Sequence, residues 1–182
     1  MVRNRSTLST LPWVTAAAVL GIGIAARDCV LIAMGPVFGL YAFNAGMVCG
    51  APWQGWRAAI RCWLVGTLGL IAAVALMVMA VGALVGWWTP ANDQPARSLS
   101  VLLIATAACW IAHGRMPGSE YMQSMFLTSV AAAALAIAAK AHDLRLAPCV
   151  FAVLISIFTA ALAWRLARHA GRELAISDQS AM

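Results

Sequence analysis

Charged residues are scarce in this chain. Only 10% of the 182 residues are charged, whereas about 25% is usual in a soluble domain. The three histidines lie in different predicted loops or tails, and no glycine-rich phosphate loop is present. The acidic residues are dispersed, so none is paired for acid–base catalysis: Asp28, Asp93, Glu120, Asp143, Glu173 and Asp178. The sequence therefore predicts that the chain is not an enzyme.

Paired cysteines and basic runs are also absent. The five cysteines are scattered without any Cys-x-x-Cys spacing, which predicts neither a disulfide framework nor a zinc site. Met77 and Met79 are of a residue type that binds copper, but methionines inside an apolar run usually pack in the core. We predict no metal and no other cofactor. The net charge of +6 comes from basic residues in short loops, without interleaved aromatics, so nucleic acid is not a predicted partner.

Hydrophobic residues, in contrast, make up 63% of the chain. A soluble domain of this length has no core large enough to bury them, so we expect lipid to surround the protein. The apolar runs are too long for barrel strands. The predicted fold is an all-α, polytopic transmembrane helical bundle of about six spans. It comprises a cytoplasmic segment (1–10), a transmembrane domain (11–172) and a polar tail (173–182).

A long apolar run without any charge extends from Cys62 to Trp88. It exceeds the roughly 20 residues that a span requires, and Trp63 and Trp87 would lie at opposite membrane surfaces. We expect this run to form the central helix, entered from the basic segment that contains Arg57 and Arg61.

Turn chemistry divides the remaining chain into further helices. Arg27-Asp28 is a short charged break, residues 89–95 form a loop, and Ser98 or Ser100 is expected to cap a helix over 99–112. Lys140 is expected to end the next helix, for which Ser119 is the predicted cap. Three G-x-x-x-G spacings predict close helix contacts, at Gly35/Gly39, Gly46/Gly50 and Gly82/Gly86.

Basic residues predict the orientation of the chain. With six spans and both termini in the cytoplasm, eight Lys and Arg residues lie inside and four outside, as the positive-inside rule requires. A bacterial-type inner membrane is the expected location. Five spans remain an alternative, in which residues 11–49 form a re-entrant hairpin plus one crossing.

Two groups of residues are candidate functional sites. Arg27 and Asp28 form either a plain loop or an ion or proton coupling site. Arg57 and Arg61 share one helix face, and they are either interfacial anchors or a cationic entrance for an anion. Gly66 and Thr67 lie about one turn deeper, where a missing side chain and a hydroxyl could admit and bind a solute.

The motif of Arg61, Gly66, Thr67 and Gly69 resembles that of the fusaric acid resistance and aromatic acid exporter (FUSC-like) family. Tyr121 and Thr128, and the basic tail from Arg165 to Arg172, are similar to further features of its membrane domain. The family usually has the Gly-Thr pair three residues after the arginine, whereas the gap here is five. The chain corresponds to a single membrane half of the large members.

The resemblance implies export of small organic anions, such as aromatic carboxylates, by a homo-oligomer. The alternative is a non-transporting membrane subunit or scaffold that packs against partner membrane proteins. A transporter should have polar groups along a shared cavity, whereas a scaffold should show small-residue seams.

Overall fold

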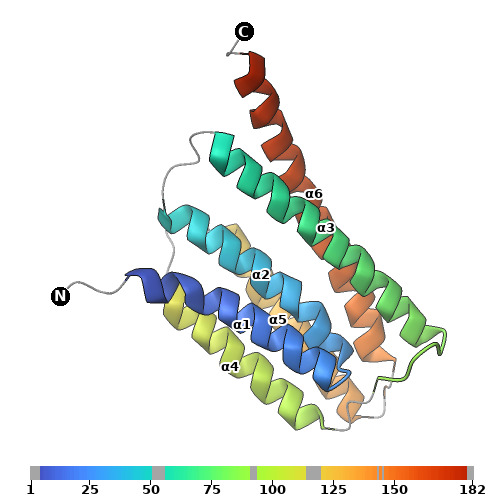
Figure 1. Cartoon of the computed structure of the whole chain (residues 1–182). Helices are drawn as coiled ribbons and strands as arrows, with labels where there is room; N and C mark the ends of the chain where they lie inside the picture. Colours follow the sequence, from blue (N-terminus) through green and yellow to red (C-terminus); the bar gives the residue numbers. More distant parts are fainter. Residues whose placement is uncertain are drawn as a thin grey trace.

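In the computed structural model, the described residues form six α-helices (Figure 1). It describes residues 5–50, 56–90, 94–113, 120–142, 144 and 146–179, and the side chains at 11–43, 59–90, 94–111, 123–142, 144, 146–168 and 170–172. The helices are α1 (Arg5–Ala25), α2 (Cys29–Gly50), α3 (Trp56–Leu84), α4 (Pro95–His113), α5 (Glu120–Ala141) and α6 (Ala147–Gln179). No strand occurs in these described ranges. The predicted all-α class is therefore confirmed.

Three of the helices are long and apolar enough to cross a membrane, fewer than the six that the sequence predicted. Their apolar segments are Ala59–Leu84 in α3, Gln123–Ala141 in α5 and Ala147–Arg172 in α6. The other three helices contain shorter apolar segments within the part that the structure describes: Leu11–Ala25, Cys29–Phe43 and Pro95–Ile111.

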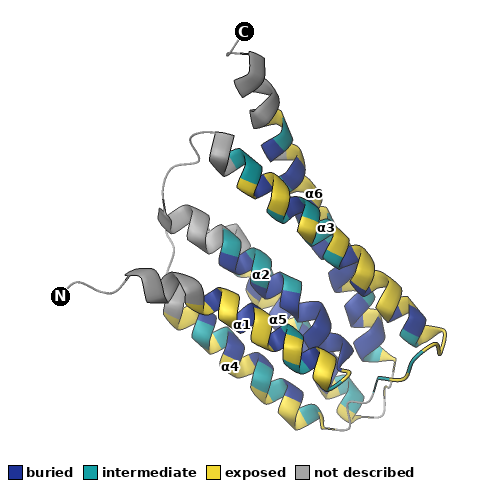
Figure 2. Ribbon diagram, viewed as in Figure 1, coloured by how far each residue is buried: buried dark blue, intermediate teal, exposed yellow. Residues whose placement is uncertain are grey.

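Helix α2 lies at the centre of the bundle. It packs against each of the other five helices, and most of its residues with described side chains are buried and none of them is exposed (Figure 2). Its sequence explains this position, because a helix that is apolar on all sides is stable only when it is surrounded. The large buried side chains of Leu31, Met34 and Phe38 fill the core between α1, α4 and α5.

Helix α3 is peripheral, so the prediction that it is the central helix was wrong. Among the described helices, it packs only against α6 and, over a shorter length, α2. Its outer face exposes an apolar row that includes Leu64, Leu68, Ile71, Val74 and Val78 (Figure 2). A long uncharged run indicates that a helix can cross a bilayer, but it does not distinguish a lipid-facing helix from a buried one.

A seam of small residues joins α3 to α6. Gly66 lies against Ala163 and Ala167, and a Cβ atom built on Gly66 would come within 2.7 Å of the Ala167 nitrogen. Gly69, one turn later, lies against Ala163. Small side chains let two helix backbones approach closely, which is how membrane helices gain packing energy. The two helices consequently form the long pair at one side of the molecule (Figure 1).

The break between α1 and α2 is a compact reversal of three residues. The Asp28 amide donates to the Gly23 carbonyl (2.8 Å) and the Arg27 amide to the Ile24 carbonyl (3.1 Å). These two bonds form a Schellman motif, in which the first residue after the C-cap adopts the left-handed conformation. Arg27 occupies that position with φ of 49°.

The end of α3 has the same geometry, which corrects two predictions. Gly86 is left-handed (φ 82°), and the Trp87 amide donates to the Gly82 carbonyl (2.8 Å). The helix ends at Leu84, and the Trp88 indole folds back to donate to the Met79 carbonyl (2.8 Å). Gly82 and Gly86 therefore do not form a helix-packing pair, because Gly86 terminates the helix and Gly82 packs beside Trp87.

Of the other predicted glycine contacts and helix ends, the structure confirms some and contradicts others. Gly35 lies close to Leu20 of α1, whereas a Cβ on Gly39 would meet nothing within 4 Å; Gly46 and Gly50 lie outside the described side chains. Neither Ser98 nor Ser100 caps α4, because that helix begins earlier, at Pro95. Helix α5 ends directly after Lys140, as predicted, and Ser119 lies outside the described residues.

Candidate functional site

Among the cavities formed by the described residues, the most spacious one found is a groove between α5 and α6. It encloses about 320 Å³ and opens on the surface of the bundle. Three hydroxyl residues of α5 and three large apolar residues of α6 are prominent among those that line it: Ser124, Thr128, Ser129, Phe151, Leu154 and Phe158. None of the residues that line the groove carries a charge.

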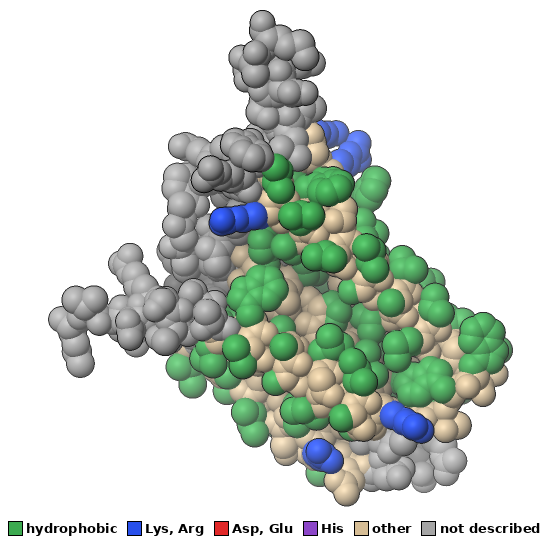
Figure 3. Space-filling view, in the orientation of Figure 1, with side chains coloured by type: hydrophobic (Ala, Val, Ile, Leu, Met, Phe, Trp, Pro, Cys, Tyr) green, Lys and Arg blue, Asp and Glu red, His purple; other side chains and the backbone are tan. Residues whose placement is uncertain are grey.

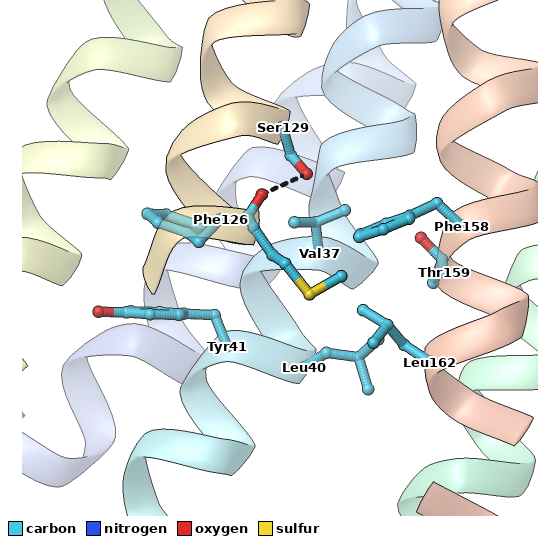
Figure 4. A pocket seen from close by; sticks show the side chains of 9 residues that line it. Val37, Leu40, Tyr41, Phe126, Ser129, Phe158, Thr159 and Leu162 are labelled. Carbon is cyan, nitrogen blue, oxygen red and sulfur yellow. Dashed lines mark hydrogen bonds between the residues drawn. The ribbon is translucent and has the colours of Figure 1, made fainter. Parts of the chain in front are cut away.

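A smaller cavity between α2, α5 and α6 shares part of its lining with the groove (Figure 4). Met125, Ser129 and Phe158 line both spaces. The smaller cavity encloses about 20 Å³ and reaches Tyr41 on α2 and Thr159 on α6. This is room for a water molecule but not for an organic ligand, so an organic ligand would have to bind in the outer groove.

Aromatic packing fixes the wall formed by α2. The Tyr41 ring stacks on Phe126 with centroids 4.2 Å apart, and Phe38 meets the same ring edge-on at 5.0 Å. Offset stacking and edge-to-face contacts stabilise such clusters by about 0.5–1.5 kcal/mol per pair. Tyr41 and Phe126 therefore form a rigid wall, while Phe158 contributes from the opposite side (Figure 4).

Hydroxyl groups that line the groove and the smaller cavity donate to their own helices. Thr128 donates to the Ser124 carbonyl (2.7 Å), Ser129 to the Met125 carbonyl (2.9 Å) and Thr159 to the Ile155 carbonyl (2.7 Å). Each hydroxyl proton is thus engaged within its own helix in this structure. The groove is otherwise apolar, and its lining consequently suits an apolar or aromatic body.

Arg27 and Asp28 lie together at one end of the bundle. Arg27 is exposed, whereas Asp28 is only 2% exposed. One Asp28 carboxylate oxygen accepts from the Val30 amide (2.9 Å) and the Leu31 amide (3.4 Å), and the other accepts from the Ser98 hydroxyl. Asp28 is therefore the N-cap of α2 and connects the α1–α2 turn to α4. This geometry gives Asp28 a structural role, and the coupling role stays a prediction.

Arg61 lies at the opposite end of the bundle. It is exposed, and the side chain of Arg57 lies outside the described residues. The antiparallel contact of Gly66 with Ala167 brings the start of α3 level with the exposed Arg168 and Arg172 of α6. Lys and Arg side chains gather at both ends of the molecule in Figure 3, and hydrophobic side chains cover the surface between them.

Gly66 and Thr67 do not form an opening for a solute. Ala163 and Ala167 fill the space beside Gly66. The Thr67 hydroxyl donates to the carbonyls of Trp63 (3.0 Å) and Leu64 (2.9 Å) in its own helix. In this structure Gly66 lets α3 pack closely against α6, and the Thr67 hydroxyl serves the α3 helix.

The predicted site residues thus fall into two groups at opposite ends, and the structure does not bring them together. Sequence reasoning missed the groove. Its signal was three hydroxyl residues close together in one apolar helix, at Ser124, Thr128 and Ser129. Of these, only Thr128 was noticed, through the family resemblance. No set of three or more His, Cys, Asp or Glu side chains in the described part of the chain is placed to hold a metal ion.

No family model, curated protein or solved structure matches the chain. The resemblance to the aromatic acid exporters therefore stays a prediction, and the functional argument depends on the geometry of the chain itself.

Proposed function

We propose that the chain is a six-span protein of a bacterial-type inner membrane, with both termini in the cytoplasm. The complete α1, α2 and α4 helices contain 21, 22 and 19 residues, so each is about 28–33 Å long. That length is close to the roughly 30 Å hydrocarbon core of a bilayer. The apolar outer face of α3 supports the same conclusion, because lipid is the solvent that such a surface requires.

We further propose that the protein exports small organic anions with an aromatic or apolar body, acting as an oligomer. The observation that carries this proposal is the α5–α6 groove, whose 320 Å³ and apolar walls suit a ring of that kind. Arg61, Arg165, Arg168 and Arg172 are exposed at the end assigned to the cytoplasm. They would attract the anion before it reaches the groove.

A substitution that fills the groove tests the proposal. Ala132 lines the groove, so Ala132→Phe should place a ring in the ligand space. Ala131 is exposed and does not line it, so Ala131→Phe is the matched control. At equal membrane expression, Ala132→Phe should lose protection of cells against benzoate or salicylate, whereas Ala131→Phe should protect like the parent. Equal protection by both variants would exclude the groove as the binding site.

Substitutions of Arg61 test the proposed electrostatic attraction of the anion. An arginine fork binds a planar carboxylate better than a lysine does. Arg61→Ala should therefore lose protection while the protein still inserts, and Arg61→Lys should recover only a part. If all three forms protect equally, Arg61 is an interfacial anchor.

A non-transporting membrane subunit is the second candidate. The observation that favours it is the broad exposed face of α3, which has only α6 and α2 as neighbours. A subunit of this kind should purify in a mixed complex and leave anion efflux unchanged when it is deleted. A homo-oligomer that moves labelled benzoate in proteoliposomes contradicts this alternative.

A further inference from the structure

One face of α6 changes from apolar to basic along its length. Phe151 and Phe158 line the groove, and Leu162 lines the smaller cavity beside it. Arg165 and Arg172 continue the same row at intervals of seven residues, because a helix returns to nearly the same direction after two turns. The α6 wall of the groove therefore leads directly into arginine side chains.

Three arginines form a cluster in the second half of α6. Arg165, Arg168 and Arg172 are three and four residues apart, so their side chains are neighbours on one side of the helix. All three are exposed, and Lys and Arg side chains are visible beside this part of α6 in Figure 3. Asp28, the one acidic residue whose side chain the structure describes, belongs to the α1–α2 turn at the opposite end of the bundle (Figure 1). Its carboxylate therefore does not neutralise the cluster.

The arginines lie at the depth of lipid headgroups. A helix crosses the hydrocarbon core of a bilayer with about 20 residues, so a span that begins at Ala147 leaves the core near Arg165. Trp164 is 57% exposed at this point, and exposed tryptophans are typical of the membrane interface. Arg168 and Arg172 then extend through the headgroup layer.

The groove lies within reach of a lipid chain from the same leaflet. Phe158 is seven residues from Arg165, or about 10 Å along α6, whereas one leaflet contributes about 15 Å of hydrocarbon. The groove opens on the surface of the bundle, and none of its lining residues is charged. An acyl chain has no hydrogen-bonding group, so these apolar walls match it.

We propose that the α5–α6 groove and the α6 arginine cluster form one site for an anionic phospholipid. The acyl chain lies in the groove, and the phosphate binds Arg165, Arg168 and Arg172. Guanidinium groups bind phosphate oxygens through paired hydrogen bonds, and three of them favour a lipid with net negative charge over a zwitterionic one. The leaflet is the cytoplasmic one in the orientation proposed above.

The lipid site extends beyond the proposed export activity. The acyl chain and the exported anion are alternative occupants of the groove. Lipid binding requires neither a transported solute nor a gradient, so it is measured on the purified chain. Its failure would leave the benzoate test unaffected, and a failed benzoate test would leave the lipid site unaffected.

Native mass spectrometry of the full chain in detergent tests the proposal. Titration with dioleoyl phosphatidylglycerol should show one lipid per chain, bound on the order of 100-fold more tightly than dioleoyl phosphatidylcholine, because each arginine contributes roughly fivefold. Replacing Arg165, Arg168 and Arg172 together by glutamine should abolish this preference. Arg97→Gln is the matched control, since Arg97 is exposed at the start of α4, and it should bind like the parent. If the triple variant fails to insert, Arg165→Gln alone should weaken phosphatidylglycerol binding about fivefold, and unchanged binding would overturn the site.

The groove is tested by the two alanines of α5. Ala132 lines the groove, and Ala131 is exposed and does not. Ala132→Phe should weaken phosphatidylglycerol binding about tenfold, which corresponds to two methylene groups that are no longer buried. Ala131→Phe should bind the lipid like the parent.

Three results contradict the lipid site. One is equal affinity of the parent for phosphatidylglycerol and phosphatidylcholine. Another is displacement of phosphatidylglycerol by an equal concentration of glycerol phosphate, because the arginines would then bind a free phosphate without the chain. The third is a dimer that Ala132→Phe converts to monomers, because a second copy of the chain would then occupy the groove.

Discussion

The α3–α6 seam makes a quantitative prediction for Gly66→Ala. The new methyl group would lie 2.7 Å from the Ala167 nitrogen, 2.8 Å from the Ala167 Cβ and 2.9 Å from the Ala163 carbonyl oxygen. Ordinary contacts of a Cβ begin near 3.4 Å. The helices would have to separate by roughly 0.7 Å at this point, because two of the three neighbours are backbone atoms that no rotamer change can move.

Overpacking of this kind costs about 1–3 kcal/mol. For a chain of this length, that corresponds to a decrease in Tm on the order of 2–10 °C. The assay is thermal unfolding of the purified protein in one detergent, followed by tryptophan fluorescence. Gly21→Ala is the matched control, since a Cβ on Gly21 meets nothing within 4 Å. It should keep or slightly raise the Tm, because alanine favours the helix by about 1 kcal/mol. A Gly66→Ala variant that is as stable as Gly21→Ala refutes the tight seam.

Three further substitutions test the turns and the Asp28 network by the same unfolding assay. Arg27→Gly should stabilise the protein by about 1 kcal/mol, because it removes the cost of a left-handed non-glycine residue, and an unchanged Tm contradicts this. Gly86→Ala should destabilise by a similar amount for the opposite reason; a stabilised variant would show that the residue is not left-handed. Ser98→Ala should cost about 1–3 kcal/mol, because it removes a donor from the buried Asp28 carboxylate. Ser100→Ala, which loses only a bond within its own exposed helix turn, is the control and should change little.

Local sequence signals predicted the helices well. The charged break at Arg27-Asp28, the proline-rich loop after α3 and the lysine near the end of α5 all lie where one helix stops. The residues that start or stop a helix lie within one or two turns of its end, so a single sequence is sufficient to identify them. The helix ends were less accurate, since α3 stops at Leu84 and α4 starts at Pro95.

Contacts between distant segments could not be predicted in the same way. The Asp28–Ser98 bond spans 70 residues, and Gly66 and Ala167, which lie against each other, are farther apart still. The apolar run of α3 is hydrophobic enough for a central helix, so its composition alone did not show that it is peripheral. Only the packing of α2 against every other helix shows which of the two is surrounded.

The candidate sites were predicted unevenly for the same reason. The basic residue at 61 was correctly expected near a helix end, because charge at an apolar boundary is a local signal. The space beside Gly66 was assigned to a solute, although α6 fills it. The groove depends on α5 and α6 lying side by side, and no spacing within either helix shows that.

The most direct test of the membrane account is the side on which each end of the chain lies. A reporter active only in the cytoplasm should function when fused after Met182, and a reporter active only outside should function when inserted at Asn92. Six spans predict both results. A C-terminal reporter that is active only outside the cytoplasm contradicts six spans with cytoplasmic termini and favours five.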